Sequence, residues 1–287
     1  MSKKHQFHAA IWTALGAAFA FAPSQGMAAP VLGSSLASFA VLGAQGVTNV
    51  GTSTIGGNLG SAPNASVGGG YVFTSGTLQA NTALAQQAQI DLDAAIGAVT
   101  SGAADFTIAA GNGNLDAYQA AHGGFLAPGT YDVGAGTSNL LTNLFLNGGN
   151  DSNAVWRFRF SSTFIMSENS NVSVFNVGTG AGVGIYWFAD SAATLDGATL
   201  VGNVFANQTI SSNGGLTLGC GRLASAEAQV TLINDTISQG CGVLGDIGFG
   251  SGGFDQGNGV PEPTTLLLAG LGLAGTLVSR KKFSTPR

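Results

Sequence analysis

The sequence predicts a mostly β fold, a β-solenoid of triangular cross-section with one long α-helix packed alongside. Three observations predict it. Short segments of alternating apolar and polar residues lie between glycine or asparagine turns, as expected for strands. Part of the chain repeats in units of 18 to 22 residues. Only one long stretch between the chain ends has helical periodicity and almost no glycine.

The strand pattern is clearest in "AVWRFRF", residues 154–160, where the side chains alternate between two faces. Val155, Arg157 and Arg159 fall on one face, and the three aromatic residues between and after them fall on the other. The segments "VGIYWFA", "LVGNVFA" and "CGRLASA" are predicted to be further short strands.

The repeat predicts stacked coils. Gly184, Gly202 and Gly221 each open a strand, at spacings of 18 and 19 residues, and Tyr186, Val204 and Leu223 hold similar places after them. Between these strands, pairs of threonine and an apolar residue recur twice in each unit. Because neighbouring residues on a strand face opposite ways, the apolar partner points inward and threonine outward. An antiparallel sandwich of short strands is the alternative, but the threonine pairs keep their place in every unit, which favours a solenoid with three strands per coil.

The helix is predicted over residues 77–101, in "TLQANTALAQQAQIDLDAAIGAVTSG". One apolar face contains Leu78, Ala85, Ala88, Leu92, Ala95, Ile96 and Val99. Ser75 or Thr77 could cap its start, and Gly102 its end.

The charge balance excludes some classes of partner. Between residues 29 and 259 there are three arginines, no lysine and thirteen carboxylates, a formal charge of −10. Nucleic acid is therefore not an expected partner, because no basic patch exists to hold phosphates. Cys220 and Cys241 are the only cysteines, and in an exported protein we expect them to form one disulfide, with two buried free thiols as the alternative.

Both ends of the chain carry targeting signals. Residues 1–28 have the basic start, apolar run and small residues before Ala28 of a secretory signal peptide. At the other end, Val260-Pro261-Glu262-Pro263 precedes an apolar run, residues 264–279, and then three basic residues. As a helix, this run reaches roughly 24 Å, rather short for a bilayer. A transmembrane tail anchor is one interpretation.

The order of these elements in residues 260–287 resembles a PEP-CTERM sorting tail. The resemblance implies that an exosortase-type membrane enzyme recognises and removes the tail. We therefore expect a protein that is secreted or associated with the cell surface, with a domain at residues 29–259.

No catalytic residue, metal site or cofactor is predicted. The carboxylates are scattered: Asp91 and Asp93 lie on different sides of the helix, and Asp190, Asp196 and Asp235 sit at turns between strands. His122 has no visible relay partner. The glycine clusters lack the lysine of a phosphate-binding loop.

The order of motifs resembles the DUF3494 ice-binding protein family. It opens with "FAVLGAQGVTNVGTSTIGGNLGSAPNASVGG" and continues, after the alanine-rich helix, with Leu126-Ala127-Pro128-Gly129-Thr130-Tyr131. Ala154, Trp156 and Phe158 match the next motif, and residues 184–237 match the last. The resemblance implies a right-handed, discontinuous solenoid, in which the first coils come from the N-terminus and the rest from residues after the helix.

The resemblance also implies adsorption to ice through a flat, regular, uncharged face. Two sets of outward residues could form it: Thr163, Thr194, Thr209 and Thr231, or Ser173, Thr199, Thr217 and Thr236. Outward threonine is also simply favourable on a strand. The T-A/G-X-T/N pair that some members of the family carry is not found. The alternative function is a non-catalytic matrix or adhesive protein without ice activity, with exopolysaccharide as its partner.

Overall fold

The computed structural model describes residues 31–240, except positions 112, 137, 138, 179, 181 and 198. The helices within these residues are α1 (Ser34–Ala37), α2 (Ala83–Thr100) and α3 (Leu115–Ala121). The strands are β1 (Phe39–Gly43), β2 (Gly46–Gly56), β3 (Asn58–Ser61), β4 (Val67–Ser75), β5 (Leu78–Ala80), β6 (Phe106–Ile108), β7 (Gly129–Val133), β8 (Asn143–Asn147), β9 (Val155–Phe160), β10 (Phe164–Met166), β11 (Asn171–Phe175), β12 (Gly184–Ala189), β13 (Ala193–Leu195), β14 (Thr199–Ala206), β15 (Ile210–Ser212), β16 (Thr217–Ser225), β17 (Gln229–Ile233) and β18 (Thr236–Ser238).

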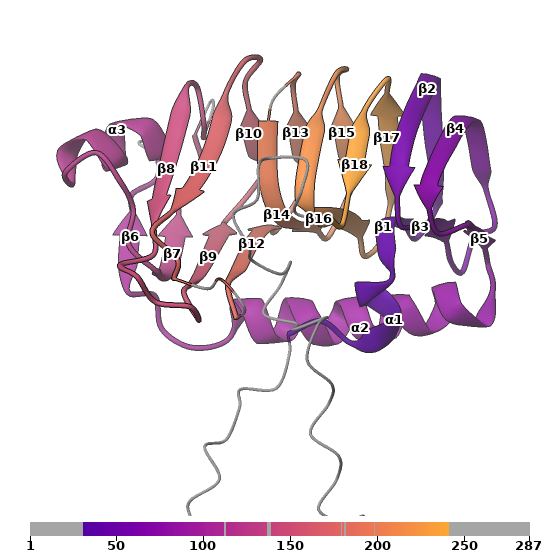
Figure 1. The fold of residues 1–287 in the computed structure, drawn as a ribbon, viewed down its shortest axis with the longest axis horizontal. Coiled ribbons are helices and arrows are strands. Elements are labelled where there is room, and N and C mark those ends of the chain that lie inside the picture. The colour runs from indigo at the N-terminus through magenta and orange to yellow at the C-terminus, as the bar shows by residue number, and fades with distance from the viewer. Residues whose placement is uncertain are drawn as a thin grey trace, which may run out of the picture.

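The strands form a solenoid with three faces, and every strand pairing in the described residues is parallel (Figure 1). Face a contains β6, β7, β9, β12, the second halves of β14 and β16, β1, β3 and β5. Face b contains β10, β13, β15, β17 and the first parts of β2 and β4. Face c contains β8, β11, the first halves of β14 and β16, β18 and the second parts of β2 and β4. The predicted solenoid is confirmed, and the antiparallel sandwich is wrong.

The order of the coils in space differs from their order in the sequence. β1 pairs with β16, and β2 pairs with β17 and β18. The N-terminal coils therefore stack on the last coils of the chain, and the segment after α2 begins at the far end of the solenoid (Figure 1). This discontinuity is what the family resemblance implies.

Helix α2 covers face a and runs along the length of the stack (Figure 1). Its buried residues, Ala85, Ala88, Leu92, Ala95 and Val99, are those predicted for the apolar face. They pack on a cluster that includes Phe39, Leu42, Phe205 and Ala224. Since α2 and the interior bury both sides of face a, β12 is buried at every position.

The predicted start of the helix is wrong. Residues 78–80 form β5, which pairs with β3 from Leu59 to Ser61, and Asn81 takes a positive φ of 49°. The helix begins at Ala83 after Thr82, whose Oγ1 accepts a hydrogen bond from the backbone N–H of Ala85 at 3.3 Å. Leu78 fits a helical face by spacing alone, but pairing with a distant strand decides its structure.

The interior contains a stack of aromatic rings. Phe158 lies 4.3 Å from Trp187 and 5.1 Å from Tyr131, measured between ring centroids. Each indole N–H is satisfied, that of Trp156 by the Leu126 carbonyl and that of Trp187 by the Val201 carbonyl. The predicted alternation of β9 is confirmed, since Trp156, Phe158 and Phe160 are buried and the residues between them are only partly so.

One predicted equivalence between coils is wrong by a residue. Tyr186 pairs with Asn203 and then Arg222, whereas Val204 pairs with Trp187 and Leu223. Paired residues of β12 and β14 are 17 positions apart, whereas Gly184 and Gly202 are 18 apart, because Gly202 lies at an irregularity of β14 between Val201 and Asn203, with a φ of 97°. Counting residues from the glycines cannot reveal such a shift.

Several predictions concern residues outside the described part of the chain. These are the signal peptide at residues 1–28, the sorting tail at 260–287 with its apolar helix, and Cys241 of the predicted disulfide. Cys220 is buried in β16. No helix of the described residues is long and apolar enough to cross a membrane.

Candidate functional site

Faces b and c carry regular outward rows of short side chains on rigid strands. Neighbouring strands in a sheet lie about 4.8 Å apart, and alternate residues along a strand about 6.7 Å apart. Each face is therefore a lattice with two fixed spacings, one across the coils and one along the strands.

The central row of face b contains four hydroxyl side chains on successive coils. Thr194 pairs with Ser211, Ser211 with Thr231, and Thr231 with Thr48. The Oγ1 atoms of Thr48 and Thr231 lie 3.4 Å apart. Ile165 precedes this row and Gly68 follows it. Of the predicted set, Thr194 and Thr231 lie in this row.

Thr163 and Thr209, the other two members of that set, lie in a second row of face b. They directly precede Phe164 and Ile210. Phe164 pairs with Ala193, and Ala193 pairs with Ile210, so these three buried residues hold the same position on three successive coils. Thr163 is two positions before Ile165, and Thr209 is two positions before Ser211, so all four face outward. The structure thus brings the whole set to one face, in two adjacent rows.

The central row of face c is a ladder of four threonines. Thr199 pairs with Thr217, Thr217 with Thr236, and Thr236 with Thr54. Asn171 and Val72 extend the row at its two ends. Ser173, the remaining predicted residue, lies two positions beyond Asn171 in the next row, opposite Phe145.

The residues that sequence reasoning missed are Thr48, Ser211 and Thr54. Thr48 and Thr54 belong to the N-terminal β2, and they complete rows whose other members lie near the C-terminal end of the domain. The sequence "VTNVGTST" contains both threonines, but only the stacking of β2 on β17 and β18 places them.

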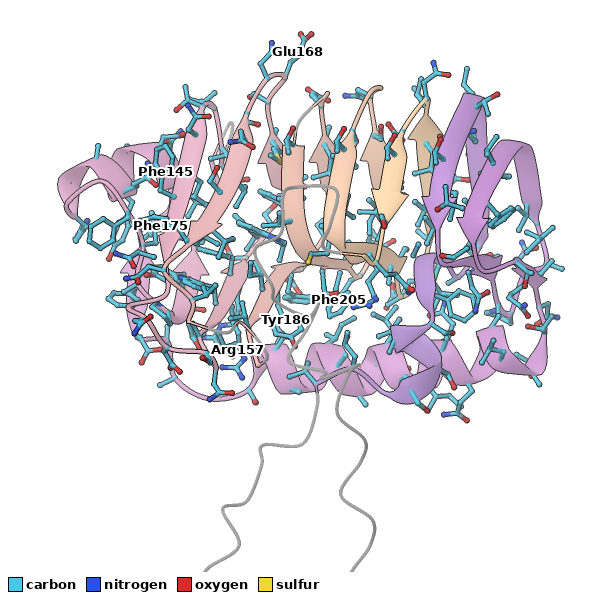
Figure 2. All side chains as sticks on the ribbon, in the orientation of Figure 1. Phe145, Arg157, Glu168, Phe175, Tyr186 and Phe205 are labelled. Atoms are coloured by element: carbon cyan, nitrogen blue, oxygen red, sulfur yellow. The ribbon has the colours of Figure 1, made fainter. Side chains whose placement is uncertain are left out.

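The two faces differ in flatness. On face c, Phe145 and Phe175 project from β8 and β11 (Figure 2). The register of β4 against β2 shifts on both faces, after Thr48 on face b and between Ile55 and Gly56 on face c. On face b, β13, β15 and β17 pair without a register shift, and β17 pairs with β2 over five consecutive residues. Face b is therefore the more regular lattice.

The corner between faces b and c is held by a buried carboxylate. Asp235 Oδ1 accepts hydrogen bonds from Ser212 Oγ at 2.7 Å and Leu216 N at 2.9 Å. Its backbone N–H donates to Ser53 Oγ at 2.9 Å, so the network links three coils. Burial raises the pKa of the Asp235 carboxyl, and these hydrogen bonds act against the rise. Its role is to fix the corner.

Three of the other carboxylates noted in the sequence make structural contacts, and Asp93 is exposed on α2. Asp190 and Asp196 form cross-coil contacts to Asn207 and Asn213. Asp91 caps α1. The His122 ring stacks on Tyr118 with centroids 3.9 Å apart, and its Nδ1 lies 2.7 Å from the Tyr118 carbonyl oxygen. No group of three potential metal ligands occurs in the described residues.

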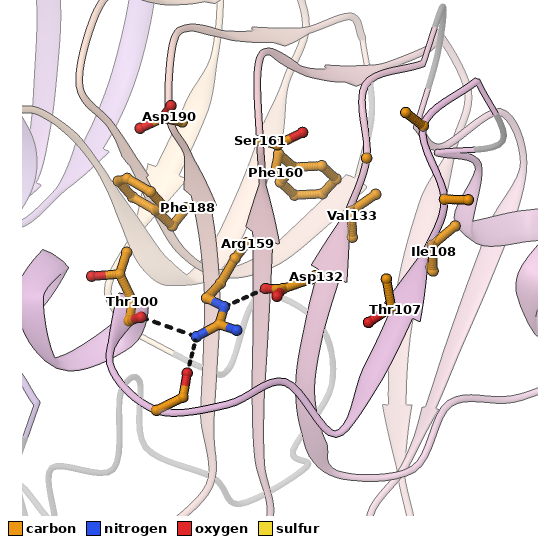
Figure 3. Close-up of a pocket in the computed structure, with 14 residues that line it drawn as sticks. Thr100, Thr107, Ile108, Asp132, Val133, Arg159, Phe160, Ser161, Phe188 and Asp190 are labelled. Atoms are coloured by element: carbon orange, nitrogen blue, oxygen red, sulfur yellow. Dashed lines mark hydrogen bonds and ion pairs between the residues drawn. The ribbon is translucent and has the colours of Figure 1, made fainter.

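A hollow of about 530 Å³ lies beside face a, where the chain leaves α2 (Figure 3). Arg159 crosses it: its Nε lies 2.5 Å from Asp132 Oδ1, and its Nη1 donates to the carbonyls of Thr100 and Gly102. The guanidinium thus ties the end of α2 to β7 and β9. Arg159 pairs with the Asp132 carboxylate, whereas the buried Nε of Arg157 has no hydrogen-bond partner among the described residues.

Residues 41–238 match the Ice-binding-like family. The chain belongs to this family. An ice-binding protein of Nostoc sp. (strain HG1) is 29% identical over 250 residues, which cover 85% of each chain. Residues 259–282 match the PEP-CTERM protein-sorting motif, as the sequence of the tail predicts.

Solved structures of ice-binding-like proteins share the fold. The crystal structure of the ice-binding protein from the Antarctic ascomycete Antarctomyces psychrotrophicus has a TM-score of 0.61 at 30% identity, covering 71% of this chain and 95% of that one. An ice binding protein from an Antarctic biological consortium gives 0.61 at 28% identity, covering 75% and 93%.

Proposed function

We propose that this protein adsorbs to ice through face b and restrains crystal growth or recrystallisation. Relatives with this fold are ice-binding proteins. The observation that carries the assignment to face b is the row Thr194, Ser211, Thr231 and Thr48, on four successive coils of a face that no helix of residues 31–240 covers.

Such a row suits a ligand made of water. A charged side chain holds a mobile hydration shell, whereas a threonine offers one hydroxyl to anchor a water molecule and one methyl to order its neighbours. Each contact is weak. Because the strands already fix the positions of the side chains, binding costs little conformational entropy, and many weak contacts can add up. The strands of face b carry no charged residue.

Face b is preferred to face c for two reasons. It offers a second row with hydroxyls, at Thr163 and Thr209, beside the central one. It also lacks the exposed rings of Phe145 and Phe175, which would hold a planar crystal surface away from the threonine ladder of face c. A flat ligand needs many simultaneous contacts, so these projections favour face b.

A matched pair of substitutions tests the proposal. Thr231 and Thr217 are both partly exposed threonines, each followed by a buried leucine. We expect Thr231→Tyr to remove most of the thermal hysteresis and ice shaping of the protein, and Thr217→Tyr to retain them. The proposal is wrong if crystals grow unshaped in the unmodified protein at high concentration. Equal loss in both variants would reject face b in particular.

We further propose that the protein is exported by residues 1–28 and that an exosortase-type enzyme removes the tail after recognising Val260-Pro261-Glu262-Pro263. The PEP-CTERM match supports this. The mass of the protein recovered from cells tests it: a processed chain lacks the apolar run 264–279 and the basic residues after it. A full-length chain in the membrane fraction would instead indicate a retained transmembrane anchor.

The proposed disulfide joins Cys220 to Cys241. Cys220 is buried at the corner of β16 between faces c and a, with a positive φ of 53°. A bridge there would tie the chain beyond β18 to the solenoid. Mass spectrometry after thiol alkylation, with and without reduction, distinguishes a bridge from two thiols.

We propose no catalysis. The family supports a binding role, and the charged groups of the hollow in Figure 3 are occupied with structural contacts. Release of product from a polysaccharide by the purified protein would contradict this.

A further inference from the structure

Three phenylalanine rings are exposed together at the end of the solenoid that carries α3. Phe125, Phe145 and Phe175 have 40%, 39% and 42% of their surface exposed. Figure 2 shows Phe145 and Phe175 on the outer side of β8 and β11. Phe125 and Phe175 meet edge to face, with centroids 6.4 Å apart. Large exposed rings in a cluster are unusual on a soluble protein and indicate a contact surface.

The rings lie on three successive coils. Leu126 bridges to Leu146, which places Phe125 beside Phe145, and Phe175 pairs with Asn147 on the next coil.

Amide side chains lie on the same strands as the rings, with Asn147 opposite Phe175 and Asn176 directly after it. Asn176 Nδ2 donates to Asn147 Oδ1 at 3.0 Å, and Asn171 Nδ2 donates to Ser173 Oγ at 2.9 Å. An amide has two donor hydrogens and two acceptor lone pairs, so each of these contacts uses only part of the hydrogen-bonding capacity of its asparagine. The strands β8 and β11, described in full, contain no charged residue.

We propose that Phe125, Phe145 and Phe175, with the amides beside them, form a binding platform for a neutral polysaccharide. The apolar C–H face of a pyranose ring matches the face of an aromatic ring, which carries partial negative charge. The hydroxyl groups at the edge of the same sugar match amide donors and acceptors. Because Phe125 and Phe175 meet edge to face, one sugar would stack on one ring while neighbouring sugars of the chain contact the other two.

The other occupants of an exposed aromatic cluster fit less well. The three rings expose on the order of 250 Å² together, far below the roughly 800 Å² per partner of a stable protein interface, so a second copy is not favoured. A membrane-surface site would combine the rings with lysine or arginine, but no lysine occurs between Lys4 and Lys281. A sugar chain requires neither a large area nor a charge.

This platform goes beyond ice adsorption and does not depend on it, because it lies on face c. The alternative function predicted from the sequence was contact with an exopolysaccharide matrix. The platform is a definite surface for that contact. A protein with both activities would hold a polysaccharide at one end of the solenoid and present face b to ice.

Native gel electrophoresis in the presence of a neutral polymer tests the platform. The exported protein is run in gels containing hydroxyethyl cellulose, dextran or α-mannan, and the concentration that retards it is measured. We expect retardation by at least one polymer and, in the double variant Phe145→Ala/Phe175→Ala, weakening by about ten-fold or more. Phe145→Tyr/Phe175→Tyr keeps the rings and should keep the binding.

Val72→Ala is the matched control, because Val72 is an apolar residue at the other end of face c, 53% exposed. It should bind each polymer as the unmodified protein does. The proposal is overturned if no polymer retards the protein, if the double alanine variant is retarded equally, or if the tyrosine variant loses binding. It is also overturned if the rings instead drive dimerisation or binding to phosphatidylcholine vesicles. Ice shaping should persist in the double alanine variant. A failure of the polysaccharide proposal can therefore be distinguished from a failure of the ice-binding proposal for face b.

Discussion

The hydroxyls of Thr48 and Thr231 lie 3.4 Å apart although 183 residues separate them in the chain. This contact joins the N-terminal β2 to β17 in the central row of face b. The face proposed for ice is therefore built from both ends of the domain.

The two threonines of β2 provide a test of this arrangement. Thr48 belongs to the central row of face b and Thr54 to that of face c, within one strand. We expect Thr48→Tyr to lower thermal hysteresis as Thr231→Tyr does, because both break the same row, while Thr54→Tyr leaves it unchanged. Circular dichroism should show the same fold in both variants. A loss confined to Thr54→Tyr would assign the activity to face c.

Two glycine substitutions should have opposite effects on stability. A Cβ on Gly221 would lie 1.7 Å from the Gly202 carbonyl oxygen of the neighbouring coil, whereas a Cβ on Gly97, exposed on α2, would meet nothing within 4 Å. We expect Gly221→Ala to lower the free energy of unfolding by about 4 kcal/mol or more. Gly97→Ala should raise it by about 0.5–1 kcal/mol. Urea unfolding measures both, and a mild effect at Gly221 would contradict the close approach of the coils.

Asp91 of α2 serves as the cap of α1, which has no side-chain cap of its own. Its Oδ2 accepts hydrogen bonds from the backbone N–H groups of Ser35 at 2.9 Å and Leu36 at 3.2 Å. We expect Asp91→Ala to lower the free energy of unfolding by about 1–2 kcal/mol. Asp93→Ala, an exposed carboxylate of the same helix, should change it by less than about 0.5 kcal/mol. Similar effects of the two variants would exclude the capping role.

The buried Asp235 should make stability depend on pH. Since burial raises its pKa in the folded protein, the folded state binds the proton more tightly than the unfolded state does. Its contribution to stability is therefore fully present below the ordinary carboxyl pKa of about 3.9 and is lost as pH rises through the folded value. The unfolding free energy of the unmodified protein, relative to that of Asp235→Asn, should fall as pH increases from about 3 to 7. A difference that grows with pH would show a lowered pKa instead.

Local patterns predicted the coils well because a strand shows its inward and outward faces in neighbouring residues. Thr194 beside Leu195 and Thr236 beside Ile237 are arranged as expected, with the apolar residue buried. The start of α2 was missed because Leu78 suits either structure, and its partner Leu59 is distant in sequence.

The candidate site could be predicted only in part from the sequence. Each outward threonine can be recognised from its buried neighbour, but which threonines share a row depends on how the coils stack. Thr48 and Thr54 join their rows only through pairing with β17 and β18. Phe145 and Phe175 were missed because apolar residues in a strand suggest the interior, and only the register of β8 and β11 turns them outward.

The stacking of β2 on β17 and β18 also constrains how the protein is made. The N-terminal coils pair with one another through β1–β3 and β2–β4, but their junction with β16, β17 and β18 forms only after residue 238 has been synthesised, so the middle of the solenoid is completed last. Pairing between such distant segments is slow to form. The rigid stack that presents face b is therefore whole only when both ends of the domain have been made.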